Sequence, residues 1–232
     1  MRRPWHRADP GLLEKMKAEV QGAYPNLHFY PTPDQVIVRG TFPIVHEGEV
    51  LDRYLVEIEL PHDYPDAMPV VREVGGRVPR TVDYHVNSTG EACLFLPDER
   101  WSVYPPGTSF LAFLEGPVRN FFLGQSIFRL TGKWPFGERR HGPDGIRDYY
   151  TELLGTDDIK VILGYLECLA RPVPKGHWEC PCRSGKRLRD CHRAQFEDLR
   201  SKVAPSVAKR SLEFLRAASA RQSGGGGPGA GG

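Results

Sequence analysis

The chain has 232 residues, of which 40% are hydrophobic and 26% are charged, and its formal net charge is +2. This balance is typical of an ordinary globular protein, and it excludes a strong electrostatic field for nucleic acid or for an anionic membrane. No apolar run reaches the roughly 20 residues that span a bilayer, and no apolar stretch follows the basic N-terminal residues. We therefore expect a cytoplasmic protein that acts on neither membranes nor nucleic acid.

The first half of the chain predicts one helix followed by antiparallel strands. An Asp-Pro pair at 9–10 is typical of a helix start, and we expect a helix over 10–21 with apolar residues at helical spacing. Strands are expected at 36–38, at 54–60, where apolar and polar residues alternate, and at 70–74. The short connections between these strands favour an antiparallel meander over a βαβ unit.

The second half predicts mainly helices, after a loop over 78–106. We expect helices over 109–129, 144–154, 157–170 and 193–221. The Gly-Pro pair at 116–117 should kink or split the first of these helices. The final residues, 223–232, are almost all glycine and are expected to be disordered.

The five cysteines fall into three groups by position. An odd number in a reducing compartment argues against a disulfide framework. Cys168 lies in an apolar helical stretch, where packing is the expected role. Three more cluster near the C-terminus, whereas Cys93 stands alone in a polar loop.

Cys93 follows a polar turn, Asn-Ser-Thr-Gly-Glu at 87–91, so we expect it near the surface. The alternative is that it is a small buried hydrophobic residue, as many lone cysteines are. His85 and Asn87 precede it closely, and Trp101 follows eight residues later. A thiol beside an amide side chain and a histidine is a residue set that can hold an acyl group on sulfur and stabilise an oxyanion.

The region from Asp9 to Leu130 resembles the ubiquitin-conjugating enzymes. That family has a His-Pro-Asn triplet, then Gly-x-x-Cys-Leu, and a Trp eight residues after the cysteine. The matching segments here are His85-Val86-Asn87, Gly90-Glu91-Ala92-Cys93-Leu94 and Trp101. Upstream, Leu60-Pro61-His62-Asp63-Tyr64-Pro65 with Pro69-Val70-Val71 is similar to the family's Pro-x-x-Tyr-Pro…Pro stretch.

The sequence departs from the family pattern at two points and carries one unusual segment. Val86 stands where the family has proline, and Asn87 precedes Cys93 by six residues where the family has eight. The segment 132–142 is more similar to bacterial relatives found in antiphage operons. The resemblance therefore implies an α+β fold over 1–170, a ubiquitin-conjugating-enzyme-like antiparallel meander with flanking helices, and a role in antiviral defence.

The activity that the resemblance implies is acyl transfer. Cys93, as thiolate, would take a protein C-terminus from another thioester and pass it to an amine. The expected partner is a ubiquitin-like protein or another protein with a conjugatable C-terminus, with or without an activating enzyme. Asn87 would donate to the oxyanion or brace the loop, and His85 would hold the loop. Candidates for the role of the family's later acidic residue are Asp98, Glu138, His141 and Asp144.

A second motif predicts a small metal module over 171–222. Two thiols one residue apart and a later Cys-His pair can close a tetrahedral shell. The predicted ligands are Cys180, Cys182, Cys191 and His192. The spacing resembles the SEC-C zinc-binding motif, with Gly185 in the turn, Arg183 where the motif prefers Gly, and Leu188 where it prefers an aromatic residue. Four filled positions imply a structural zinc ion that supplies folding energy to the module.

Three other functional interpretations stay open. The chain could be a catalytically idle adaptor that keeps the fold and acts through its zinc module. Cys93 could instead pair with His85 or His141 as a hydrolase dyad. The final Gly231-Gly232 is either the end of a linker or an acyl donor like the diglycine end of ubiquitin-like proteins.

Overall fold

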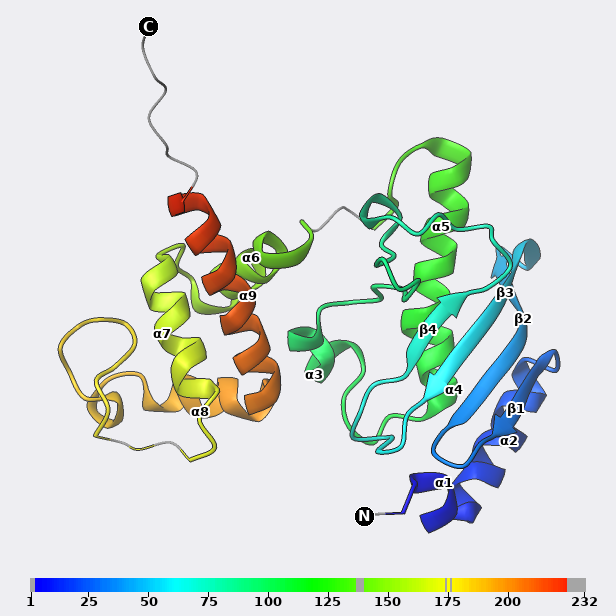
Figure 1. Cartoon of the computed structure of the whole chain (residues 1–232), viewed down its shortest axis with the longest axis horizontal. Coiled ribbons are helices and arrows are strands. Elements are labelled where there is room, and N and C mark those ends of the chain that lie inside the picture. The colour runs from blue at the N-terminus through cyan, green and yellow to red at the C-terminus, as the bar shows by residue number, and fades with distance from the viewer. Residues whose placement is uncertain (1–2, 137–139, 174, 176, 225–232) are drawn as a thin grey trace, which may run out of the picture. The chain divides into compact units, whose positions relative to one another are not determined.

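The structure is a computed structural model that describes residues 3–136, 140–173, 175 and 177–224. The chain forms two compact units, Met1–Phe95 with Ser102–Gly137 and Leu96–Trp101 with Glu138–Gly232. All four labelled strands belong to the first unit, and helices α6 to α9 belong to the second (Figure 1). The predicted α+β class is confirmed.

A four-stranded antiparallel sheet forms the first unit's framework. Its strands follow chain order, as β1 (Leu27–Pro31), β2 (Val36–His46), β3 (Glu49–Leu60) and β4 (Val70–Glu73). The predicted meander is therefore confirmed, although β2 is longer than the expected 36–38. Strand β1 was not predicted, because only Leu27 of its five residues is buried and no alternation marks it.

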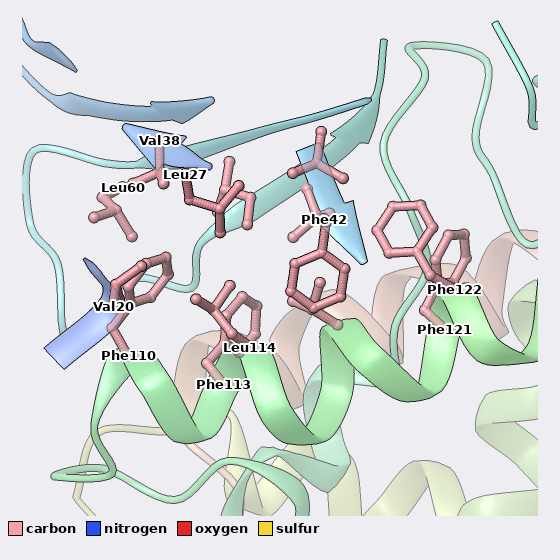
Figure 2. Close-up of a cluster of buried hydrophobic side chains, with 14 of the residues drawn as sticks. Val20, Leu27, Val38, Phe42, Leu60, Phe110, Phe113, Leu114, Phe121 and Phe122 are labelled. Carbon is pink, nitrogen blue, oxygen red and sulfur yellow. The ribbon is translucent and has the colours of Figure 1, made fainter. Parts of the chain in front are cut away.

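One face of the sheet is covered by a helical layer. Along β3, the alternation predicted from the sequence puts Tyr54, Val56, Ile58 and Leu60 in the core. Phe110, Phe113 and Phe122, from the helical segment that follows the cysteine loop, point toward this face (Figure 2). Burial of such large aromatic side chains supplies much of the unit's stability.

The long helix expected over 109–129 is interrupted in the middle. Ser109 Oγ accepts the Ala112 N–H at 3.1 Å and begins α4 (Phe110–Phe113). The segment Leu114–Val118 is a π-helix around Pro117, which has no N–H to donate. Helix α5 (Arg119–Thr131) then continues to Gly132. The predicted break at 116–117 is thus a π-helical turn between α4 and α5, and the segment stays helical throughout.

Two helices precede the sheet. The short α1 (Trp5–Ala8) was not predicted, but α2 (Pro10–Ala23) begins as expected, with Asp9 Oδ1 accepting the Leu12 N–H at 3.0 Å. Its buried residues are Leu13, Met16 and Val20. This helix lies beside β1 at one edge of the sheet (Figure 1).

The second unit is helical and has its own core. It contains α6 (Gly142–Leu154), α7 (Ile159–Leu169), α8 (Arg193–Lys202) and α9 (Pro205–Gly224). Tyr150, Leu166 and Leu212 are buried together in this core. The predicted domain boundary at residue 170 does not coincide with this division, because the apolar faces of α6 and α7 pack with α9. The same core includes Cys180 and Leu188 from the predicted metal module.

The single helix expected over 193–221 is two helices. Val203, at the end of α8, has an extended backbone with φ −110° and ψ 115°. Pro205 then begins α9, as is common for proline in the first turn of a helix. Residues 225–232, with Gly231-Gly232, lie outside the described residues, so the disorder predicted for the tail stays a prediction. Among the helices of the described residues, none has the length and hydropathy to cross a membrane.

A close approach between Gly40 on β2 and Asn26, the residue before β1, gives a testable prediction. A Cβ atom on Gly40 would lie 1.8 Å from the backbone oxygen of Asn26. We expect Gly40→Ala to lower the free energy of unfolding by at least about 2 kcal/mol, because backbone atoms must move. Chemical denaturation of the full chain measures this loss. Gly22→Ala in α2, where nothing lies within 4 Å, is the control and should be neutral or stabilising. A Gly40→Ala variant as stable as the wild type would contradict the packing.

Candidate functional site

Cys93 lies in an exposed part of a loop that is anchored at its backbone. The preceding residue pairs with the sheet, since Ala92 N donates to Val71 O at 2.8 Å. Cys93 N itself donates to His85 O at 2.8 Å, which closes the loop. The side chain is exposed, as the polar turn predicted. The thiol is therefore presented to solvent from a backbone that is held on two sides.

The side chain of Asn87 is engaged within the turn. Its Oδ1 accepts the Thr89 N–H at 3.0 Å, the Thr89 hydroxyl at 2.7 Å and the Glu91 N–H at 2.9 Å. Its Nδ2 donates to Glu91 Oε2 at 2.9 Å. An amide oxygen that gathers local N–H groups in this way stabilises a turn. The geometry supports bracing as a role of Asn87, and oxyanion donation stays a prediction.

An ion pair connects this turn to the sheet. Arg72 on β4 donates to Glu91 Oε1 at 2.9 Å and to Glu59 Oε2 at 3.2 Å. Because these groups are partly exposed, each pair contributes only modestly to stability. Their effect is geometric: Glu91 receives Arg72 on one oxygen and Asn87 on the other, so the turn is tied to the sheet edge.

His85 meets the cysteine loop through its backbone. It ends a short 3-10 helix, Val82–Tyr84, and has a left-handed conformation with φ 53°. Its ring lies edge to face with Trp134, with 4.5 Å between the ring centroids. The carbonyl of Tyr84 accepts a hydrogen bond from Gln125 Nε2 at 2.6 Å. These contacts support the loop-holding role predicted for His85.

Asp98 is buried in the core of the second unit. The Tyr150 hydroxyl donates to its Oδ1 at 2.5 Å, and the Ser211 hydroxyl lies 2.9 Å from each carboxylate oxygen. Burial raises the pKa of Asp98, and the hydrogen bonds from Tyr150 and Ser211 oppose that rise. Only 2% of the residue is exposed, so this environment argues against a role beside an attacking amine.

The remaining sequence candidates fall in three places. Tyr64, at the end of the family-like proline stretch, is buried, with its hydroxyl 3.4 Å from that of Tyr104. Trp101 packs in the second unit, where its Nε1 donates to the Tyr149 hydroxyl at 2.9 Å. His141 and Asp144 lie at the start of α6, and Glu138 is outside the described residues. The acid role considered for Glu138, His141 and Asp144, and the hydrolase role considered for His141, stay predictions.

The predicted metal ligands come together in the second unit. One ligand atom from each of four residues lies within 4.8 Å of all the others, and the residues are Cys180, Cys182, Cys191 and His192. The Cys182 and Cys191 sulfur atoms are 3.6 Å apart, and His192 Nδ1 lies 3.2 Å from the Cys191 sulfur. Tetrahedral coordination at a metal–sulfur distance of about 2.3 Å separates neighbouring ligands by about 3.5–3.8 Å. The donor set could therefore bind a metal ion, with separations that lie on both sides of this range.

Backbone turns bring these ligands together. Cys180 N donates to Lys186 O at 2.8 Å and Leu188 N to Trp178 O at 2.7 Å, which forms a hairpin-like turn. Gly185, predicted to permit this turn, has φ 75°. Arg183, which stands where the SEC-C motif prefers Gly, also has a left-handed φ of 64°. A left-handed conformation of this kind favours glycine, so the backbone at Arg183 agrees with the expected motif position.

The cysteine thiols differ in their environments. Burial raises the pKa of Cys180 to about 11. Burial acts in the same direction on Cys182, but hydrogen bonds from Ser184 and the neighbouring cysteines outweigh it and lower the pKa to about 6. Burial also raises the pKa of Cys168 on α7, which packs at the edge of the second core. The packing role predicted for Cys168 agrees with this position.

In comparisons with known proteins, no family model, no curated protein and no solved structure matches the chain. The resemblance to ubiquitin-conjugating enzymes and to the SEC-C motif therefore rests on the motifs themselves. Sequence reasoning missed Arg72, Gln125 and Trp134 as residues that support the cysteine loop. These residues contact the cysteine loop from distant positions in the sequence, so no local pattern marks them. Only the segment around Trp134 stands out in the sequence, as unusual for the family.

Metal binding by the second unit can be tested with a matched pair of cysteine variants. We expect the full chain to bind about one equivalent of Zn²⁺ through the four clustered ligands. Cys191→Ser should weaken this binding by about 100-fold or more, because it removes one thiolate ligand. Cys168→Ser, outside the cluster, should bind as the wild type does. Competition with a chromophoric chelator measures both, and equal affinity for the two variants would exclude the site.

The burial of Asp98 predicts a specific pH dependence. Because burial raises its pKa in the folded chain, Asp98 favours folding most when protonated, below its unfolded-state pKa. That contribution is lost as the pH rises through the folded-state pKa. Relative to Asp98→Asn, which does not titrate, the wild type should therefore lose stability as the pH rises from about 3.5 toward 7. Denaturant unfolding of both proteins across this range measures the difference, and a pH-independent difference would contradict it.

Proposed function

We propose that this chain is an acyl-transfer enzyme of the ubiquitin-conjugating type. It carries a protein C-terminus as a thioester on Cys93 and passes it to an amine, in a bacterial antiphage conjugation system. The observation that supports this most is the exposed Cys93 on a backbone fixed by Ala92 and His85. An antiparallel meander before that loop and a long aromatic-rich helix after it are what a ubiquitin-conjugating fold requires.

The reaction needs few groups. The Cys93 thiolate attacks the carbonyl carbon of an incoming thioester, and the donor's sulfur leaves with the bonding electron pair. An amine nitrogen then attacks the Cys93 thioester, the tetrahedral oxyanion collapses, and the Cys93 thiolate leaves as the nitrogen loses its proton. An ordinary thiol with a pKa of about 8.5 is a competent nucleophile for the first step without a dedicated base.

Oxyanion stabilisation is the step in which Asn87 would take part. One such donor is typically worth about 10²–10³ in rate. In the structure Asn87 Nδ2 donates to Glu91 Oε2, so donation to an oxyanion requires that this bond exchange. The Oδ1 contacts with Thr89 and Glu91 would meanwhile keep the turn in place.

The metal ion, in this proposal, is a structural zinc. It would be held by the Cys₃His cluster of Cys180, Cys182, Cys191 and His192. All four positions are filled by protein ligands, which leaves none for a reacting group. The ion would supply folding energy to the second unit.

A non-catalytic adaptor is the second candidate function. It is favoured by the burial of Asp98, which removes one of the groups that could orient an attacking amine. In such a protein the sheet and helices would serve as a scaffold, and the metal module would bind the partner. Cys93 would then have no chemical role.

Thioester formation separates the two candidates. The full chain, co-expressed with the proteins encoded beside its gene, should form an adduct on a non-reducing gel that thiol reductants cleave. Cys93→Ser should convert the adduct to an oxygen ester that resists thiols but yields to hydroxide, and Cys93→Ala should abolish it, since sulfur carries the acyl group. Cys168→Ser, the matched cysteine control, should leave it unchanged.

Binding without an adduct would support the adaptor. If the same neighbours bind the chain without any thiol-sensitive adduct, and Cys93→Ala binds them as well as the wild type, the adaptor is correct. An adduct that persists in Cys93→Ala would place the chemistry on another residue.

A further inference from the structure

Four aromatic side chains contact one another in the first unit, and two of them belong to residues that lead into the cysteine loop. Trp134 stacks on Phe128, with 4.5 Å between centroids and an interplanar angle of 11°. Trp134 also meets the His85 ring at 4.5 Å and 82°, and Phe128 meets Tyr84 at 5.5 Å and 89°. We call these four residues the aromatic brace. It joins the segment after α5 to two consecutive residues that lead into the cysteine loop.

Helix α5 packs against this brace. Gly124 is buried on α5, and a Cβ atom there would lie 3.4 Å from the Trp134 ring. The next residue, Gln125, is 4% exposed, and its Nε2 donates to Tyr84 O at 2.6 Å. The chain at Tyr84 and His85 is thus held twice, by a hydrogen bond from α5 and by edge-to-face contacts with Phe128 and Trp134.

The brace acts on the residue that fixes the backbone of Cys93. His85 has a left-handed φ of 53°, which a residue with a side chain seldom adopts without support. This conformation directs the His85 carbonyl to Cys93 N at 2.8 Å. Contacts on the His85 ring therefore favour the backbone geometry in which this hydrogen bond forms.

We propose that Trp134 is a positioning residue for Cys93, which it holds through the His85 ring and the His85 carbonyl. The chemical importance of this positioning rests on the proposed acyl transfer at Cys93. The positioning itself does not, because it can be measured on the amide and thiol of Cys93 without any acyl donor.

Hydrogen exchange at the Cys93 amide is the direct test, on the full metal-loaded chain. Trp134→Ala should raise the exchange rate at Cys93 about tenfold, because two ring contacts are lost. Trp134→Phe retains an aromatic ring on Phe128 and should stay closer to the wild type. Phe136→Ala is the matched control: this exposed residue also lies near Gly124 but is not one of the four brace residues, and its loss should have no effect.

A second variant displaces Trp134 without changing it. Gly124→Leu places a bulky side chain against the indole, so it should reproduce the effect of Trp134→Ala at Cys93. The new side chain would also meet the Phe136 ring, and Phe136→Ala controls for the displacement of that ring. Exchange at Val56 and Ile58, in the core of β3, reports whether the unit remains folded and should not change. Alkylation of Cys93 by iodoacetamide, followed by peptide mapping, should change in rate in the same variants.

The results distinguish this inference from the function on which its importance rests. Wild-type exchange and alkylation at Cys93 in both Trp134→Ala and Gly124→Leu would overturn it, as would an equal effect of Phe136→Ala. Accelerated exchange throughout β3 would show that Trp134 only stabilises the unit, which would also overturn it. A shift confined to the cysteine loop in a protein that forms no thioester would leave the positioning intact and exclude the acyl transfer.

Discussion

The geometry of the cysteine loop depends on one backbone hydrogen bond, from Cys93 N to His85 O. It closes a turn whose interior is filled by the Asn87 side chain and whose far side is paired with β4 through Ala92 and Val71. A reactive side chain works best when its backbone is fixed and only the reacting atom meets solvent. Here Cys93 is exposed, while backbone hydrogen bonds at Ala92 and Cys93 hold the main chain. Burial also helps to order the loop, because Val86 lies in the first core and Ala92 and Leu94 pack against that core.

The chain after Cys93 contributes to two cores in quick succession. Leu94 and Phe95 pack against the first core, whereas Leu96 packs against the second. Asp98 then places its carboxylate between the hydroxyls of Tyr150 and Ser211. A fragment that begins after residue 137 would leave both hydroxyls without this acceptor, and unsatisfied buried groups are costly. The second unit is thus complete only with six residues from the loop, Leu96–Trp101.

Sequence reasoning succeeded where the signal is local. The Asp9 cap, the alternation along β3 and the spacing of the metal ligands are each encoded within a few residues, and each is found in the structure. Sequence reasoning failed where tertiary packing alone determines which elements form and which core they join. The amphipathic pattern of α6 and α7 does not say which core they join, and β1 has a single buried residue, Leu27. The aromatic brace joins residues about fifty positions apart, so no local pattern could reveal it.

The two roles considered for Asn87 use different atoms, so they do not exclude each other. Its Oδ1 holds the turn through Thr89 and the Glu91 backbone, whereas its Nδ2 donates to Glu91 Oε2. Arg72 already occupies the other oxygen of Glu91. Rotation of the Glu91 carboxylate toward Arg72 would release Nδ2 as a donor and leave the Oδ1 contacts unchanged. Oxyanion donation by Asn87 stays a prediction, and in this geometry it would depend on the ion pair between Glu91 and Arg72.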